Sequence, residues 1–121
     1  MRFINSGRVI AAQLTTSAEN PLLTEDSSLI DVWFEGEAVR KQLFKKVTKA
    51  EQESFTAALA KRGFVRSGNL LIDPRAVLFA EMENSIVGGL ITIGWQDNGK
   101  PVELKVNGKT FEELHLLLKD R

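Results

Sequence analysis

The alternation of apolar and polar residues predicts β-strands along most of the chain. It is clearest at residues 29–35, where Ile30 and Val32 point to one side and the residues between them to the other. The same pattern predicts strands at residues 9–16, 39–47, 77–82, 90–96 and 102–106. Residues 15–28 are polar and carry no periodicity, so we expect them to form a surface loop.

Two helices are predicted, each beginning at a threonine that is followed three residues later by glutamate. In such a capping box the hydroxyl of Thr48 accepts a hydrogen bond from the amide of Glu51, whose carboxylate accepts one from the amide of Thr48. The first helix should reach about residue 62, because Gly63 tolerates the left-handed conformation that ends a helix. Thr110 and Glu113 predict the start of the second helix, which should run nearly to the last residue. The side chains expected to face inward are Phe55, Ala58, Leu59, Phe111, Leu114, Leu117 and Leu118.

The elements occur twice along the chain, because residues 70–82 restart the pattern of residues 3–14. The aligned pairs are Leu71 with Phe3, Ile72 with Ile4, Asp73 with Asn5, Val77 with Val9, Leu78 with Ile10, Ala80 with Ala12, Glu81 with Gln13 and Met82 with Leu14. Each unit is interpreted as β-β-β-β-α, with the short runs 3–4 and 71–72 as first strands. We therefore predict an α+β fold of tandem β-β-β-β-α repeats, about residues 3–62 and 71–121.

These two units should form one pseudo-symmetric domain over residues 1–121, because a unit of about 60 residues is marginal by itself. Two four-stranded antiparallel sheets are expected to pack together with the two helices. The faces opposite the helices carry large apolar residues, among them Trp33 and Phe79. We expect these faces to be covered too, by the other sheet or by a second subunit.

Composition narrows the range of functions. The 121 residues are 43% hydrophobic and 26% charged, which is typical of a globular domain, and the net charge is zero. No long-range field therefore attracts the protein to nucleic acid or to a membrane surface. The chain has no cysteine, and we find neither a signal peptide nor an apolar run long enough to span a membrane. We expect a cytoplasmic protein that does not associate with membranes.

Residues with catalytic chemistry are few. His115 is the only histidine, and no serine or carboxylate motif accompanies it. Glu112 and Glu113 are better explained by the favourable position of acids at a helix N-terminus. The glycines fall at turns and lack the spacing of a phosphate-binding loop. We expect no enzymatic activity, no cofactor and no metal site.

The one local excess of charge is a basic run in and after the predicted strand 39–47. Trp33 and Phe44 are close to it and offer faces on which nucleic-acid bases stack, worth about 1–3 kcal/mol per base. The candidate nucleic-acid-binding residues are Trp33, Arg40, Lys41, Phe44, Lys45, Lys46 and Lys49. The alternative is that the basic residues protect an edge strand against pairing with other sheets.

Alternation along residues 39–47 divides this basic run between two faces. Lys41 and Lys45 fall on the face of Val47, and Arg40 and Lys46 fall on the opposite face, unless a β-bulge shifts the pattern. A strand without a bulge would therefore not present one continuous basic track.

Two copies of β-β-β-β-α in this length resemble the single-stranded-DNA-binding fold of the plant Whirly proteins. The layout is also similar to that of a small family of uncharacterised cyanobacterial proteins assigned to the same fold superfamily. The resemblance implies two crossed four-stranded sheets braced by helices, and single-stranded DNA as a ligand. The Lys-Gly-Lys-Ala-Leu run of the Whirly proteins is absent, so no functional residue is carried over.

The sequence thus favours a non-enzymatic binding module with single-stranded nucleic acid as the candidate partner. The alternative is a protein-interaction or homo-oligomeric scaffold that has no nucleic-acid ligand. The basic run and the layout favour the first function, whereas the neutral net charge favours the second.

Overall fold

The fold is α+β, as the sequence predicts. The computed structural model describes residues 4–23, 27–36, 39–84, 88–95 and 98–119, with only the backbone described for 82–84, 88–95 and 98–101. The elements follow one another as η1 (Ser6–Arg8), β1 (Val9–Thr15), β2 (Ser27–Phe34), β3 (Arg40–Thr48), α1 (Lys49–Lys61), β4 (Val65–Ser67), β5 (Leu70–Ile72), η2 (Pro74–Ala76), β6 (Val77–Asn84), β7 (Gly88–Trp95), β8 (Asn98–Val106) and α2 (Gly108–Leu118), where η marks a 3-10 helix.

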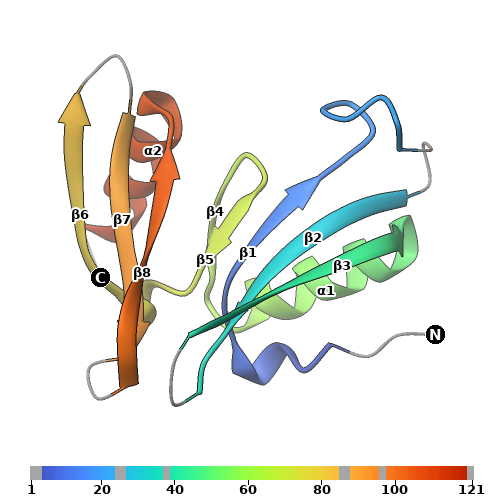
Figure 1. The fold of residues 1–121 in the computed structure, drawn as a ribbon, viewed down its shortest axis with the longest axis horizontal. Helices are drawn as coiled ribbons and strands as arrows, with labels where there is room; N and C mark the ends of the chain where they lie inside the picture. Colours follow the sequence, from blue (N-terminus) through green and yellow to red (C-terminus); the bar gives the residue numbers. More distant parts are fainter. Residues whose placement is uncertain (1–3, 24–26, 37–38, 85–87, 96–97, 120–121) are drawn as a thin grey trace.

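The described strands form a five-stranded antiparallel sheet, in the order β3-β2-β1-β5-β4, and a three-stranded antiparallel sheet, β6-β7-β8 (Figure 1). The prediction of two four-stranded sheets is wrong. Its error is in β5, which pairs with β1 through Ala11 and Ile72 instead of joining β6. β5 also forms a hairpin with β4, so the first sheet gains two strands. The predicted strand 3–4 has no counterpart, because Ile4 is outside any strand and Phe3 is outside the described residues.

The predicted capping box of α1 is confirmed. The Thr48 hydroxyl accepts a hydrogen bond from the Glu51 amide at 3.1 Å, and the Glu51 carboxylate accepts one from the Thr48 amide at 3.1 Å. Gly63 has φ 89° and ends the helix as predicted. Its amide donates to Ala60, and the Phe64 amide donates to Leu59, which satisfies carbonyls of the last turn.

The predicted capping box of α2 is wrong. The helix begins at Gly108, and Asn107 is its N-cap, with the side-chain oxygen accepting from the Thr110 amide at 2.8 Å. Asparagine caps a helix as well as threonine does, so the earlier start is equally satisfied. Glu113 is not directed to Thr110, because its carboxylate accepts a hydrogen bond from the Ser67 hydroxyl on β4.

The core has two layers, one on each face of the five-stranded sheet. The layer under α1 contains Val9, Ala12, Leu14, Ile30, Val32, Val47, Phe55, Leu59, Phe64 and Leu71. The opposite layer joins this sheet to β8 and α2 and contains Ile10, Ala11, Trp33, Val65, Leu70, Ile72, Ala76, Leu104, Phe111 and Leu114. The face of the five-stranded sheet that carries Trp33 is therefore covered by the other sheet. Phe79, on β6 of the three-stranded sheet, is 55% exposed. The inward stripe of α2 is also narrower than predicted, since Leu117 is exposed.

A buried carboxylate connects the two halves of the chain. Asp73, whose side chain is 1% exposed, caps η2 by accepting from the Arg75 amide at 3.0 Å. The Arg75 side chain binds both of its oxygens, at 3.2 and 3.1 Å, and this hydrogen-bonded pair raises the pKa of Arg75 above its ordinary value. The Asp73 amide donates to the Ile10 carbonyl at 2.9 Å, which attaches the same residue to β1.

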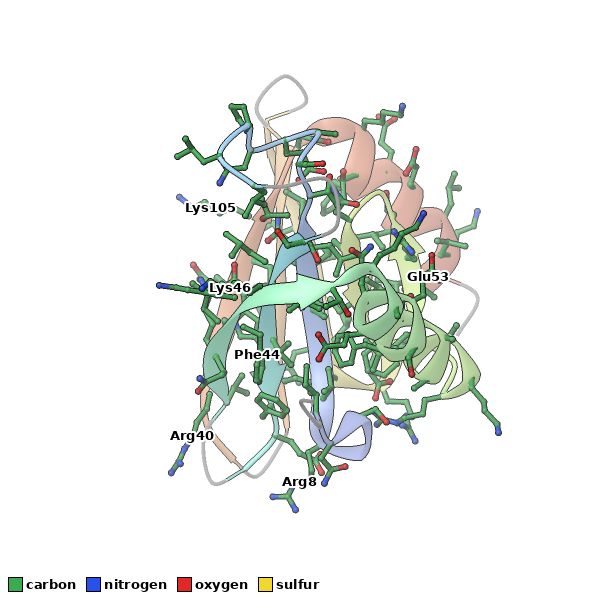
Figure 2. All side chains as sticks on the ribbon, turned by 90° about the vertical axis from the view of Figure 1, so that its right-hand side faces the viewer. Arg8, Arg40, Phe44, Lys46, Glu53 and Lys105 are labelled. Atoms are coloured by element: carbon green, nitrogen blue, oxygen red, sulfur yellow. The ribbon has the colours of Figure 1, made fainter. Side chains whose placement is uncertain are left out.

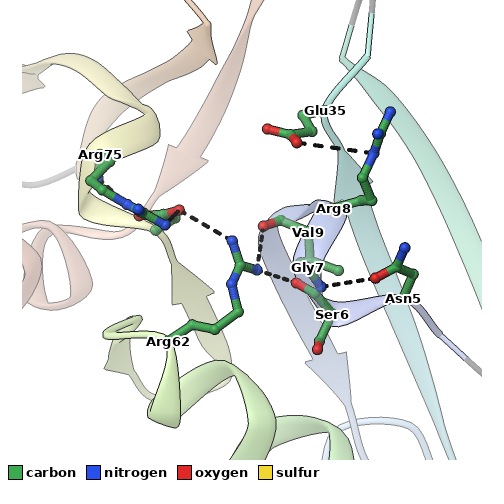
Figure 3. Close-up of polar contacts among 9 residues, drawn as sticks. Asn5, Ser6, Gly7, Arg8, Val9, Glu35, Arg62 and Arg75 are labelled. Carbon is green, nitrogen blue, oxygen red and sulfur yellow. Dashed lines mark hydrogen bonds and ion pairs between the residues drawn. The ribbon is translucent and has the colours of Figure 1, made fainter.

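Arg62, the C-cap of α1, completes this junction from the other side. Its guanidinium lies 3.8 Å from the Asp73 carboxylate and donates to the carbonyl of Val9 at 3.0 Å and to that of Ser6 (Figure 3). One guanidinium therefore fastens the end of α1, the start of β1 and the entry to η2 to one another.

Candidate functional site

The basic residues of β3 are divided between the two faces of the five-stranded sheet. Residues that pair across two strands share a face, and Lys41 pairs with Trp33 while Arg40 pairs with Phe34. Trp33 belongs to the core layer that faces the second sheet, and Phe34 packs against the layer under α1. Lys41 and Arg40 consequently point in opposite directions.

A β-bulge then shifts the rest of the strand. Phe44 pairs with Ile30 and Val47 with Ser28, so β3 has an extra residue here, and Lys46 adopts a left-handed φ of 55°. Both Phe44 and Val47 contact the layer under α1. Val47 therefore lies on the face opposite Lys41, whereas strict alternation had placed both residues on one face. Figure 2 shows that Lys46 points away from α1.

The structure thus brings together only part of the predicted binding residues. Phe44 packs edge to face on Phe34, with ring centroids 6.3 Å apart, on the same side as Arg40. Lys49 is the first residue of α1. Trp33 and Lys41 remain as one group on the opposite side of the sheet.

That group opens into a cleft between the two sheets, which has a volume of about 710 Å³. We call it the inter-sheet cleft. One wall is formed by β8 and the first turn of α2, and the other by β1, β2, β3 and the β4–β5 turn. Besides Trp33 and Lys41, its polar lining includes Gln13, Asn69, Lys105 and Asn107. A space of this size is typical of ligand-binding sites, which span roughly 300–1,000 Å³.

Lys41 covers the tryptophan of the cleft. Its ammonium group lies 5.4 Å from the centroid of the Trp33 ring and 3.9 Å from the carboxylate of Asp31. Trp33 is 5% exposed, and the Lys41 side chain is largely in solvent. Because this ring is almost fully buried, a planar ligand can stack on it only after Lys41 and other residues that cover it move aside.

The charges of the cleft are mixed. Lys41 and Lys105 are its cations, and Glu19 and Glu103 are its carboxylates. Glu19 is engaged, since its carboxylate accepts a hydrogen bond from the side-chain amide of Asn69. The cleft therefore offers a few separate cations among amide groups instead of a continuous positive surface.

Sequence reasoning missed the contributors from outside β2 and β3. Lys105, Asn69 and Gln13 meet Trp33 only because β5 pairs with β1 and because β8 lies across the resulting face. No local pattern encodes that long-range arrangement. The clean alternation at 102–106 was the only available signal, since it marks Lys105 as a residue on the face opposite Leu104.

His115 lies away from this cleft, on α2. Its ring stacks on Phe111 with centroids 6.2 Å apart, and with Ala80 and Glu112 it lines a shallow groove of about 310 Å³ between β6 and α2. Within the described ranges, no cluster of three or more histidine, aspartate or glutamate side chains could hold a metal ion.

Comparison of the chain with protein-family models, with curated proteins and with solved structures finds no match. Of the helices that the structure describes, none has the length and apolar character needed to cross a membrane. The inter-sheet cleft and the exposed surfaces are therefore the features from which a function is inferred.

Proposed function

We propose that the protein is a non-enzymatic binding module that holds single-stranded nucleic acid in the inter-sheet cleft. The observation that carries the proposal is the meeting of Trp33 and Lys41 with Lys105 of the second sheet around one space of about 710 Å³. An aromatic face flanked by separated cations is the combination that single-stranded ligands require, because bases stack and phosphates need positive partners.

The groups of the cleft suit different parts of a nucleotide. Lys41 and Lys105 supply charge to the phosphates, while the side-chain amides of Gln13, Asn69 and Asn107 can both donate to and accept from base edges. Lys45 is exposed next to the bulge of β3, and we expect it to extend the cationic side beyond the cleft. With so few cations, affinity should fall with salt according to the release of only a few counterions.

Titration of labelled single-stranded oligonucleotides by fluorescence anisotropy at low salt tests the proposal. Lys41→Glu and Lys105→Glu should each weaken binding roughly tenfold or more, and the pair Lys41→Glu with Lys45→Glu should abolish it. Lys61→Glu is the matched control, since this exposed lysine lies on α1, on the other side of the sheet. Absence of binding at low salt, or equal loss in the control, would refute the proposal.

We also infer that the two halves are copies of one unit of a 3-10 turn, three strands and a helix. Its support is the equivalence of Asn5 and Asp73, which were aligned by sequence. Asn5 caps η1 by accepting from the Gly7 amide at 3.1 Å, as Asp73 caps η2 at 3.0 Å. The resemblance in layout to the Whirly fold is the reason to test DNA before RNA.

A further inference from the structure

β6 is an edge strand that exposes large apolar side chains. In the described part of the chain β6 pairs only with β7, so its other side is open. The edge strand β3 carries four basic residues and a bulge, β4 has only three residues, and β8 contains Pro101. β6, with the sequence VLFAEMEN, has two glutamates and two register shifts but neither lysine nor proline, and its Leu78 and Phe79 are 41% and 55% exposed. Between the two shifts, residues 79–82 pair regularly with β7 and leave a short regular edge that another strand can join.

The flank of α2 continues this surface. The groove lined by Ala80, Phe111, Glu112 and His115 runs between β6 and the helix. Residues three and four apart share one side of a helix, so Glu112, His115, Leu116 and Lys119 form a stripe beside the groove. All four are exposed, and Leu116 is 59% exposed. The stripe is apolar in its middle, acidic at one end and basic at the other.

We propose that two copies of the chain associate through β6, antiparallel about a twofold axis, to form a continuous six-stranded sheet. The axis passes close to Phe79 in the strand, and the two α2 helices lie side by side on the same face of the sheet. The occupant of the open edge and of the groove is thus a second copy of this chain, independently of whether the inter-sheet cleft binds nucleic acid.

The charges on this surface are complementary to themselves under that symmetry. An antiparallel arrangement of the two stripes places Glu112 opposite the partner's Lys119 and His115 beside the partner's Leu116. The strand obeys the same rule, because an axis near Phe79 keeps Glu81 away from the partner's Glu81. An isologous contact of this kind closes as a dimer and leaves no further edge of the same sort.

A stable dimer of this kind needs a contact that extends beyond the edge of β6. A stable interface buries about 800 Å² on each partner, which is about a tenth of the 7714 Å² that one chain exposes. A strand edge alone is narrower than this, so both the strand and the stripe on α2 are needed. Leu78, Phe79 and Leu116 supply the apolar part of the contact, and the two pairs of Glu112 with Lys119 supply its polar rim.

Sedimentation velocity and multi-angle light scattering over a range of concentrations test this proposal. The wild-type chain should be a dimer that dissociates on dilution, and Phe79→Lys should be a monomer. The matched control is Leu22→Lys, because Leu22 is 91% exposed and lies in the loop between β1 and β2. The control should remain dimeric, and circular dichroism should confirm that both variants are folded.

Charge reversal gives a second test that does not depend on the strand edge. Glu112→Lys and Lys119→Glu should each raise the dissociation constant roughly tenfold, since two rim pairs become repulsive in each dimer. The double variant Glu112→Lys with Lys119→Glu should restore it. A monomer at all concentrations, a dimer that persists in Phe79→Lys, or a double variant as weak as the single ones would overturn the proposal.

Discussion

Replacement of Asp73 by alanine should destabilise the protein by about 3 kcal/mol. The change removes the cap of η2, worth about 1 kcal/mol. It also removes the partner of Arg75 and of Arg62. Loss of one member of a fully buried ion pair costs roughly 3–5 kcal/mol, and we lower this because the side chains of Arg62 and Arg75 are 24% and 66% exposed.

Two further substitutions separate the contributions. Asp73→Asn keeps the oxygen that accepts from the Arg75 amide but removes the charge, so it should cost only about half as much as the alanine change. Asn5→Ala removes the equivalent cap of η1 without removing a charge, because asparagine is neutral, and should cost about 0.5–1 kcal/mol.

Urea denaturation followed by far-ultraviolet circular dichroism measures all three. The urea concentration at the midpoint should be highest for Asn5→Ala, lower for Asp73→Asn and lowest for Asp73→Ala. The slope of the unfolding free energy against urea concentration should stay constant. If Asp73→Ala unfolds within about 0.5 kcal/mol of the wild type, or if Asn5→Ala costs as much, the junction does not carry the stability assigned to it.

Three other substitutions test separate parts of the fold. Leu59→Ala, at a residue with no exposed surface under α1, should cost about 3 kcal/mol in urea denaturation, and a cost below 1 kcal/mol would contradict the packing described. Gly63→Ala should cost about 1 kcal/mol because φ is 89° there; a higher melting temperature would show that the backbone is not left-handed at this position. Lys41→Ala should increase quenching of tryptophan fluorescence by iodide, since Lys41 covers the Trp33 ring; unchanged quenching would argue against that contact.

Local patterns were sufficient to predict the long strands and the limits of α1. The alternation at Ile30 and Val32 places both residues in the layer under α1, as expected. The Thr48 capping box and Gly63 bound a helix whose two ends are satisfied within a few residues. Such features depend on residues that are close in the sequence, so they can be predicted from it.

Features that depend on residues distant in the sequence could not be predicted from local patterns. β5 resembles a first strand of the second unit, yet it joins the first sheet because the backbone of β1 accepts it at Ala11 and Ala12. The bulge at Lys46 moves Val47 to the other face, and its position is determined by the pairing of β2 with β3. The strand predicted at residues 90–96 corresponds to β7, of which only the backbone is described.

The same long-range choices explain the outcome for the candidate site. The composition of the basic run predicted a binding surface, but the pairing register places Arg40 and Phe44 on the face under α1 and Lys41 on the opposite face. Of the predicted residues, Trp33 and Lys41 line the inter-sheet cleft, and their neighbours there come from other elements, among them β1, β5 and β8. A binding site whose residues come from several strands is assembled by the pairing of those strands, so a local motif does not predict it.

The position of β5 in the first sheet has a consequence for protein synthesis. β1 leaves the ribosome more than fifty residues before Leu70–Ile72, the segment that pairs with it. Because protein synthesis adds about 5–20 residues per second, β1 exists for several seconds before its partner β5 is made. During that interval the nascent chain presents an apolar, unpaired strand, so a chain cut after α1 should aggregate where the full chain folds. The five-stranded sheet can therefore be completed only after β5, at the start of the second half, has been synthesised.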